Sequence, residues 1–189
     1  MEKRGLKPRL GWKKGAALGL LLLLMGALLA WSLSGWAVLE VVDMDRERVV
    51  FSRLIPVGET FSMVHTHSIT KRPVRETFRV TKDRRIAIVE MEFDHFGANL
   101  PVRPEKDGSG MTEFLVRDGK YVVRYDETVY PALDLRVGQV VAHHRLHFND
   151  GTTADLVRLA GGGTYVQIRA GSLISVVEEV LPWQIKRQK

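Results

Sequence analysis

The pattern of apolar and polar positions divides the chain into two parts. From Gly15 to Leu39 the residues are uncharged and mostly apolar, whereas after Glu40 apolar residues recur at every second position. A helix as long as the first part would extend ~37 Å, which is enough to cross a hydrocarbon core of ~30 Å. We therefore predict a transmembrane helix over residues 15–39 and a separate domain over residues 40–189.

Alternation with a period of two is typical of half-buried strands, and it marks about nine short segments of the second part. The predicted strands are Arg48–Ile55, Thr60–Ser68, Val74–Thr81, Arg84–Phe93, Met111–Arg117, Lys120–Asp126, Val140–Phe148, Thr152–Leu159 and Thr164–Ala170, with Leu173–Leu181 as a further candidate. Turn residues such as Asp118-Gly119 separate them. The predicted fold class is therefore all-β: an antiparallel β-sandwich or a small barrel of about nine short strands, preceded by one transmembrane helix.

The hairpin around this Asp-Gly turn is specific enough to predict its register. A two-residue loop pairs Arg117 with Lys120. Further from the turn, the same pairing brings Glu113 opposite Arg124, whose charge is opposite. The apolar residues of both strands then share one face: Phe114, Val116, Tyr121, Val123 and Tyr125. The turn, the charges and the apolar face thus agree on one pairing.

The distribution of charge indicates how the chain is oriented in the membrane. The net charge is +6, and residues 1–14, with six Lys or Arg and one Glu, contribute +5 of it. Because basic residues beside a span stay on the cytoplasmic side, we predict a cytoplasmic tail over residues 1–14. A single crossing of a bacterial cytoplasmic membrane would then place the β-domain in the periplasm. The remaining net charge of +1 offers no basic surface, so we expect no nucleic-acid partner.

The apolar stretch also bears on whether the helix is retained. A cleaved signal peptide has an apolar region of only ~7–15 residues, and this stretch is longer. Trp12 and Trp31 lie one hydrocarbon thickness apart along the helix, and tryptophan favours both membrane interfaces. We predict a retained signal anchor. The alternative is a signal peptide cleaved near Ser32-Leu33-Ser34.

Several kinds of chemistry are absent from the sequence. The chain has no cysteine, which excludes disulfides, thiolate metal sites and cysteine nucleophiles. We find no Gly-x-Ser-x-Gly elbow, P-loop or dinucleotide fingerprint, so we expect neither an enzyme nor a cofactor; a hydrolase is the weakest of the alternatives. Two sets of polar residues alternate along predicted strands, and we expect both to be solvated: Glu90, Glu92 and Asp94, and also His143, Arg145 and His147.

A histidine and a glutamate are predicted to face each other on the apolar side of two strands. A four-residue loop over residues 70–73 would pair His67 with Glu76 and His65 with Phe78. An unpartnered carboxylate there would cost several kcal/mol, and a facing imidazole would remove that cost. The pairing would also raise the pKa of the histidine.

Three interpretations of this pair remain open. It could simply fix the register of the hairpin, or it could line a site for a small ligand or a partner protein. His65 and His67 with Glu76 could also offer metal ligands, but two or three ligands are a weak signal, and we assign no metal. The long connection Asp94–Gly110 is either a crossover between sheets or a lid or docking loop beside this hairpin.

Two stretches of the chain resemble a known family. His-Thr-His-Ser-Ile-Thr-Lys-Arg-Pro-Val-Arg-Glu-Thr-Phe-Arg-Val at residues 65–80 and Phe-Asp-His-Phe-Gly-Ala-Asn-Leu-Pro at residues 93–101 are similar to the signature stretches of the DUF1850 family. The resemblance extends from about Val38 to Ala170. Where the family usually reads Gly-Ala-Gly, this chain has Asn99 as the third residue, and asparagine still tolerates a left-handed backbone.

The resemblance implies a role but no established activity. Such proteins are small envelope proteins of unknown function, typically encoded beside TRAP transporters of the TAXI type. It therefore implies a membrane-anchored accessory protein that contacts the TRAP permease or its solute receptor. The alternative is a periplasmic β-module that binds a small ligand or a metal at a site lined by His67 and Glu76. The candidate ligand- or partner-binding residues are His65, His67, Ser68, Glu76, Gly97, Ala98, Asn99 and Pro101.

Overall fold

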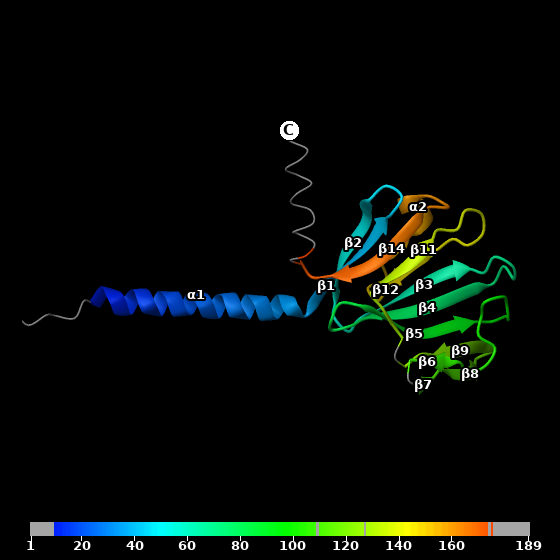
Figure 1. Ribbon diagram of the computed structural model, residues 1–189, viewed down its shortest axis with the longest axis horizontal. Helices are drawn as coiled ribbons and strands as arrows, with labels where there is room; N and C mark the ends of the chain where they lie inside the picture. The colour runs from blue at the N-terminus through cyan, green and yellow to red at the C-terminus, as the bar shows by residue number, and fades with distance from the viewer. Residues whose placement is uncertain (1–9, 109, 127, 174, 176–189) are drawn as a thin grey trace, which may run out of the picture. The chain divides into compact units, whose positions relative to one another are not determined.

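The computed structural model describes residues 10–108, 110–126, 128–173 and 175. The chain divides into two compact units, residues 1–35 and residues 36–189. Figure 1 shows that the first unit is built on one long helix and the second on strands. Most of the candidate strand Leu173–Leu181, and most of the predicted cytoplasmic tail, lie outside the described residues.

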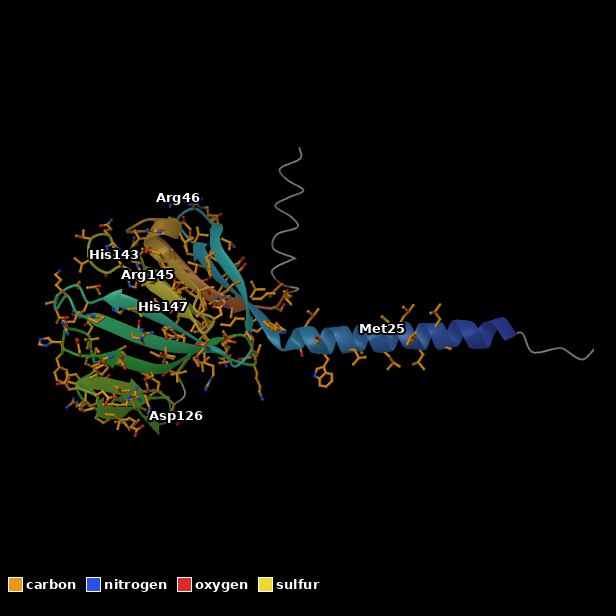
Figure 2. All side chains as sticks on the ribbon, turned by 180° about the vertical axis from the view of Figure 1, so that it is seen from behind. Met25, Arg46, Asp126, His143, Arg145 and His147 are labelled. Atoms are coloured by element: carbon orange, nitrogen blue, oxygen red, sulfur yellow. The ribbon has the colours of Figure 1, made fainter. Side chains whose placement is uncertain are left out.

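Helix α1 (Leu10–Ser34) forms from the predicted apolar stretch. By length and composition, Ala17–Ser34 is a candidate membrane span, and it is the one such helix among the described residues. Its large side chains are exposed, with Leu23 at 73% and Trp31 at 77%. Met25 lies near the middle of this helix (Figure 2). An apolar surface of this kind is what a lipid environment requires, so the helix indicates an association with a membrane.

The helix ends earlier than the predicted boundary between residues 39 and 40. Strand β1 (Trp36–Asp43) begins two residues after α1 ends, and Ala37 and Leu39 are fully buried in the β-domain. A strand that is buried on both faces reads as a continuous apolar run. Its first residues therefore continue the apolar composition of the helix, and composition alone does not separate them.

The strands form two main antiparallel sheets and no closed barrel in the part of the chain that is described, which confirms the sandwich alternative (Figure 1). The first sheet has the order β11-β14-β1-β2. Besides β1 it contains β2 (Arg48–Pro56), β11 (Ala132–Arg136) and β14 (Tyr165–Gly171). The second has the order β13-β12-β3-β4-β5-β9-β8, with β10 also paired to β5. Its strands are β3 (Thr60–Thr66), β4 (Pro73–Val80), β5 (Ile86–Phe93), β8 (Glu113–Arg117), β9 (Lys120–Arg124), β10 (Val129–Tyr130), β12 (Arg145–Phe148) and β13 (Thr153–Asp155). A separate ribbon pairs β6 (Lys106–Asp107) with β7 (Gly110–Met111).

The core lies between the two sheets. Three aromatic rings form its centre: Phe61 stacks on Phe78 at 5.6 Å between centroids and lies 6.2 Å from Phe148. Aliphatic side chains from both sheets surround them: Leu39, Val41, Ile55, Val80, Ile86, Leu146, Val166 and Ile168. Close packing of these inward-facing residues holds the sandwich together without any disulfide.

The predicted hairpin register is confirmed. Arg117 pairs with Lys120 across the β8–β9 turn, and an ion pair of 3.3 Å joins Glu113 to Arg124. One residue departs from the predicted apolar face, since Val116 is 69% exposed. β8 is the last strand of its sheet, so the outer part of that face has nothing to pack against.

Two predicted strands are partly wrong. Thr152–Leu159 forms only the short β13 and then the helix α2 (Leu156–Ala160), because the Asp155 carboxylate accepts hydrogen bonds from the N–H groups of Val157 and Arg158 at 3.0 and 3.2 Å. Such an N-cap favours a helical turn over a strand. Likewise, Val140–Phe148 is a strand only in β12, and the residues before it form a loop.

Candidate functional site

The β3–β4 hairpin differs in register from the prediction. His65 lies opposite Val74, and Met63 lies opposite Glu76, so the predicted pairing of His67 with Glu76 is wrong. The shift is an even number of residues, and it therefore leaves each side chain on its predicted face. His65 lies beside Glu76 instead, with its Nδ1 3.8 Å from the carboxyl Oε2.

His67 itself explains the difference. Its imidazole Nδ1 accepts hydrogen bonds from the N–H groups of Ile69 and Thr70 at 3.3 and 3.2 Å. Lys71 adopts a left-handed backbone with φ of 60°, and its N–H donates to the His67 carbonyl at 2.9 Å. These bonds close a six-residue loop over residues 67–72 in place of the predicted loop of four, because a side chain supplies the acceptor.

The other nitrogen of His67 holds the predicted functional loop. Because Nδ1 accepts two N–H groups, the proton is assigned to Nε2, which donates to the Ala98 carbonyl at 2.9 Å. Gly97 packs directly on the ring: a Cβ there would lie 2.7 Å from the imidazole Cε1. Asn99 has a φ of 65°, and the next N–H, that of Leu100, donates back to the Gly97 carbonyl at 3.2 Å. The two signature stretches therefore meet at His67.

This contact forms one wall of a cavity of about 360 Å³. Val74, Met91 and Leu100 make its apolar surface, and its main polar groups are His65, Glu76 and His144. Most of the candidate residues line it: His65, His67, Ser68, Glu76, Ala98 and Asn99. Gly97 is not part of the lining and lies against the His67 ring instead, and Pro101 follows the loop outside the lining.

Glu76 also lines a second hollow. This hollow has about 340 Å³ and lies between the two sheets, beside Tyr130, Asp134 and Ile168. The carboxyl group is thus placed between the cavity at the end of the β3–β4 hairpin and the interior of the sandwich.

Burial sets the protonation of these polar groups. It raises the pKa of Glu76 to about 7. Burial lowers the pKa of His65, with a smaller contribution from the charge of His67. Burial also lowers the pKa of His144 to about 4, with smaller contributions from the charges of His65 and His143. His65 and Glu76 therefore do not form an ion pair near neutral pH. The buried Nδ1 of His65 has no hydrogen-bond partner among the described residues.

His144 belongs to the site but did not stand out in the sequence. It is 7% exposed, its Nδ1 accepts the Gly138 N–H at 3.3 Å, and its ring centroid lies 5.2 Å from that of His65. A signal was available, because Leu146 and Phe148 are buried and His144 extends their alternation by one step. The sequence pattern instead grouped His143 and His147 with Arg145, and none of these three lines the cavity.

Comparison with protein families matches residues 61–155 to a domain of unknown function, DUF1850. The matched region is half of the chain and runs from β3 to β13. The chain belongs to the DUF1850 family. Neither curated proteins nor solved structures gave a match. His65, Glu76 and His144 all lie within the matched region, so the cavity is part of the DUF1850 domain itself.

In the described part of this DUF1850 domain, no three His, Asp or Glu side chains are placed together to hold a metal ion. His67, whose residue type could offer a metal ligand, uses both of its ring nitrogens in hydrogen bonds, so neither is free to coordinate a metal in this arrangement.

The polar sets that we expected to be solvated lie outside the cavity of the DUF1850 domain. The carboxylates pair with cations of neighbouring segments: Glu90 with Arg117 and Arg124, Glu92 with Lys120, and Asp94 with Arg72. Figure 2 shows His143, Arg145 and His147 along one stretch of chain, and none of them lines the cavity. Salt bridges between exposed side chains such as these add little to stability.

The buried carboxyl gives the DUF1850 domain a pH-dependent stability. Because the pKa of Glu76 rises from 4.5 in the unfolded chain to about 7, the folded state binds more protons between these values, and stability falls as pH rises through that window. We expect Glu76→Gln to be more stable than wild type by up to about 3 kcal/mol at pH 8 and by much less at pH 5.

Urea denaturation of the full chain in detergent at both pH values measures this difference. The buried histidines also make stability depend on pH, in the opposite direction, because their pKa values are lowered. Their contribution is the same in wild type and variant, so it cancels in the comparison. The exposed Glu113→Gln variant serves as the control and should change stability little at either pH. A Glu76→Gln advantage that is equal at pH 5 and pH 8 would contradict the raised pKa.

Proposed function

We propose that this DUF1850 protein is a membrane-anchored module that binds a small organic molecule in the cavity beside the β3–β4 hairpin. One observation carries the proposal: the buried Nδ1 of His65 has no partner among the described residues and lies 3.8 Å from the carboxyl group of Glu76. A buried polar atom without a hydrogen bond costs about 1–3 kcal/mol. Buried polar groups without a partner are concentrated at functional sites.

The cavity has the character of a ligand site. Its volume of about 360 Å³ falls within the ~300–1,000 Å³ typical of pockets for small molecules. An apolar surface from Val74, Met91 and Leu100 stands beside a few polar groups, which is the composition that gives both affinity and orientation. The hydrogen bonds of His67 hold its wall in place before any ligand arrives, so little ordering remains to be done on binding.

Thermal melting of the full chain in detergent tests this function. A set of short acids, amides, alcohols and amino compounds is screened, and at a concentration of 100 times its Kd a ligand stabilises the folded state by about 2.7 kcal/mol. We expect at least one compound to raise the melting temperature, and His65→Ala to abolish that rise. The matched control is the exposed His95→Ala, which should keep it. A screen without any shift, or a shift that persists in His65→Ala, would refute the proposal.

A second function is favoured by the candidate membrane span. Only Gly35 separates α1 from β1, so the chain between the two elements is very short. A tether of this kind confines the β-domain near the membrane surface and raises its effective concentration toward membrane proteins. We propose that the protein acts there as an accessory of a TRAP transport system of the TAXI type, in contact with the permease or its solute receptor on the periplasmic side.

Crosslinking in whole cells tests this second function. A photoreactive residue at the exposed position Ile69, on the rim of the cavity loop, should crosslink to the TRAP permease or receptor. The exposed position Val116, on the edge strand β8, provides the comparison and should give less of this product. Recovery of the protein without either partner would contradict the association.

A further inference from the structure

We propose that the cavity takes a small organic carboxylate, and that the proton on Glu76 controls its binding: the anion is held while Glu76 is protonated and released when Glu76 ionises. The inference rests on the proposed ligand-binding function and adds the class of ligand and its regulation. It follows from how Glu76 and the imidazoles of His65 and His144 are placed.

His144 provides a fixed donor. Its Nδ1 accepts the N–H of Gly138 at 3.3 Å, so the proton of the neutral ring is on Nε2. The ring lines the cavity, and the Nε2 atom has no hydrogen-bond partner among the described residues. An acceptor in the cavity would therefore find this N–H available at any pH near neutrality.

His65 provides a donor that depends on Glu76. The gap of 3.8 Å between its Nδ1 and the carboxyl Oε2 is too long for a hydrogen bond, and a small side-chain movement closes it. When Glu76 is protonated, its O–H donates to Nδ1, and the ring proton must be on Nε2, the nitrogen left for the cavity. When Glu76 is ionised, Nδ1–H donates to the carboxylate, and Nε2 becomes an acceptor.

The two imidazoles together select a carboxylate. Their centroids lie 5.2 Å apart, both rings line the same cavity, and with Glu76 protonated each carries its proton on Nε2. Two neighbouring donors match the two oxygens of a carboxylate, and Val74, Met91 and Leu100 match a short hydrocarbon body. No Lys or Arg is among the described lining residues, so a phosphate dianion would lack the cations that it needs.

Glu76 is the group whose charge changes near neutral pH. The tyrosines that face it stay neutral, since burial raises the pKa of Tyr125 to about 12 and also raises that of Tyr130. Asp134, across the second hollow, stays ionised because the Tyr165 hydroxyl lowers its pKa. With a pKa of about 7 for Glu76, ionisation both removes the His65 donor and adds a negative charge beside the anion. Binding should therefore weaken as pH rises through 7.

Calorimetric titration of the full chain in detergent with propionate, butyrate and valerate tests the inference. The carboxyl groups of these acids ionise well below pH 6, so they are mostly ionised at both pH 6 and pH 8. We expect the Kd of the best of them to be about tenfold weaker at pH 8, the ratio of protonated Glu76 at the two pH values. Glu113→Gln, the exposed control, should keep this ratio.

The Glu76→Gln variant tests directly whether the proton on Glu76 controls binding. Its amide N–H donates to His65 Nδ1 at every pH, so the variant should bind the carboxylate with nearly equal Kd at pH 6 and pH 8. Should this variant fail to fold, His65→Asn replaces it, because the Asn amide donates whatever the charge on Glu76, and it should also reduce the tenfold ratio.

The outcomes separate this inference from the proposed function. Suppose that butyramide or butanol binds, that His65→Ala abolishes this binding, and that no carboxylate binds. This result would support the site but overturn the proposed class of ligand. Equal carboxylate Kd at pH 6 and pH 8 in wild type would overturn the control by Glu76. No binding of acids, amides or alcohols at either pH would refute both the inference and the proposed function.

Discussion

Replacing Leu39 by alanine is expected to lower the free energy of unfolding of the β-domain by about 3–5 kcal/mol. Leu39 is fully buried in β1 and packs in the core between the sheets. The substitution removes its burial and leaves a cavity among neighbours that are held by strands on both sides. Urea denaturation of the full chain in detergent, followed by near-UV circular dichroism, measures the loss.

The matched control is the same substitution in the helix. Leu23 lies in α1 and is 73% exposed, so Leu23→Ala should change the unfolding of the β-domain by less than about 0.5 kcal/mol. This comparison decides where the candidate membrane span ends. A Leu39→Ala variant as stable as Leu23→Ala would return residues 36–39 to the membrane-spanning segment.

A methyl group at position 97 is expected to destabilise the domain by about 1–3 kcal/mol and to weaken ligand binding at least tenfold. The added Cβ of Gly97→Ala would lie 2.7 Å from Cε1 and 2.8 Å from Nε2 of His67. The φ of this glycine is not in the left-handed region, so the effect is steric. The ring and the loop must separate, which breaks the hydrogen bond to the Ala98 carbonyl and moves the cavity wall.

Gly110→Ala provides the comparison, because its Cβ would make only ordinary contacts, the nearest at 3.8 Å from the Asp107 carbonyl oxygen. It should change the melting temperature and the ligand Kd little. The His67→Ala substitution removes the ring that the added methyl group would strike. In a His67→Ala background, Gly97→Ala should therefore cause little further loss of stability. Independent, additive losses would show that the close contact is not the cause.

Much of the fold could be predicted from local patterns, and the exceptions have physical reasons. The β8–β9 hairpin was predictable because its two-residue turn, its charges and its apolar face all specify one register. In the β3–β4 hairpin the apolar faces were equally clear, but no short turn fixed the pairing. There the loop length depends on His67, whose side chain accepts two backbone N–H groups, and this bond pattern has no sequence signature.

The residues of the candidate site were also predictable only in part. The sequence left open whether the loop Gly97–Leu100 lies beside the β3–β4 hairpin, and the structure brings the two into contact through His67. The partner of Glu76 was mistaken, because that choice depended on the register. His144 comes from a loop far along the chain, and only the order of strands in the sheet, with β12 beside β3, brings it next to His65.

A nitrogen-15 spectrum of the histidine rings would show directly whether His65 and His144 bind a small molecule. The chain has six histidines, and long-range proton–nitrogen correlations of the full chain in micelles report the tautomer of each. On titration with butyrate at pH 6, we expect the ring nitrogens of His65 and His144 to shift together and saturate, while those of His95 and His147 stay unchanged. Shifts confined to His95 and His147, or none at all with any of the small molecules, would contradict a binding site in this cavity.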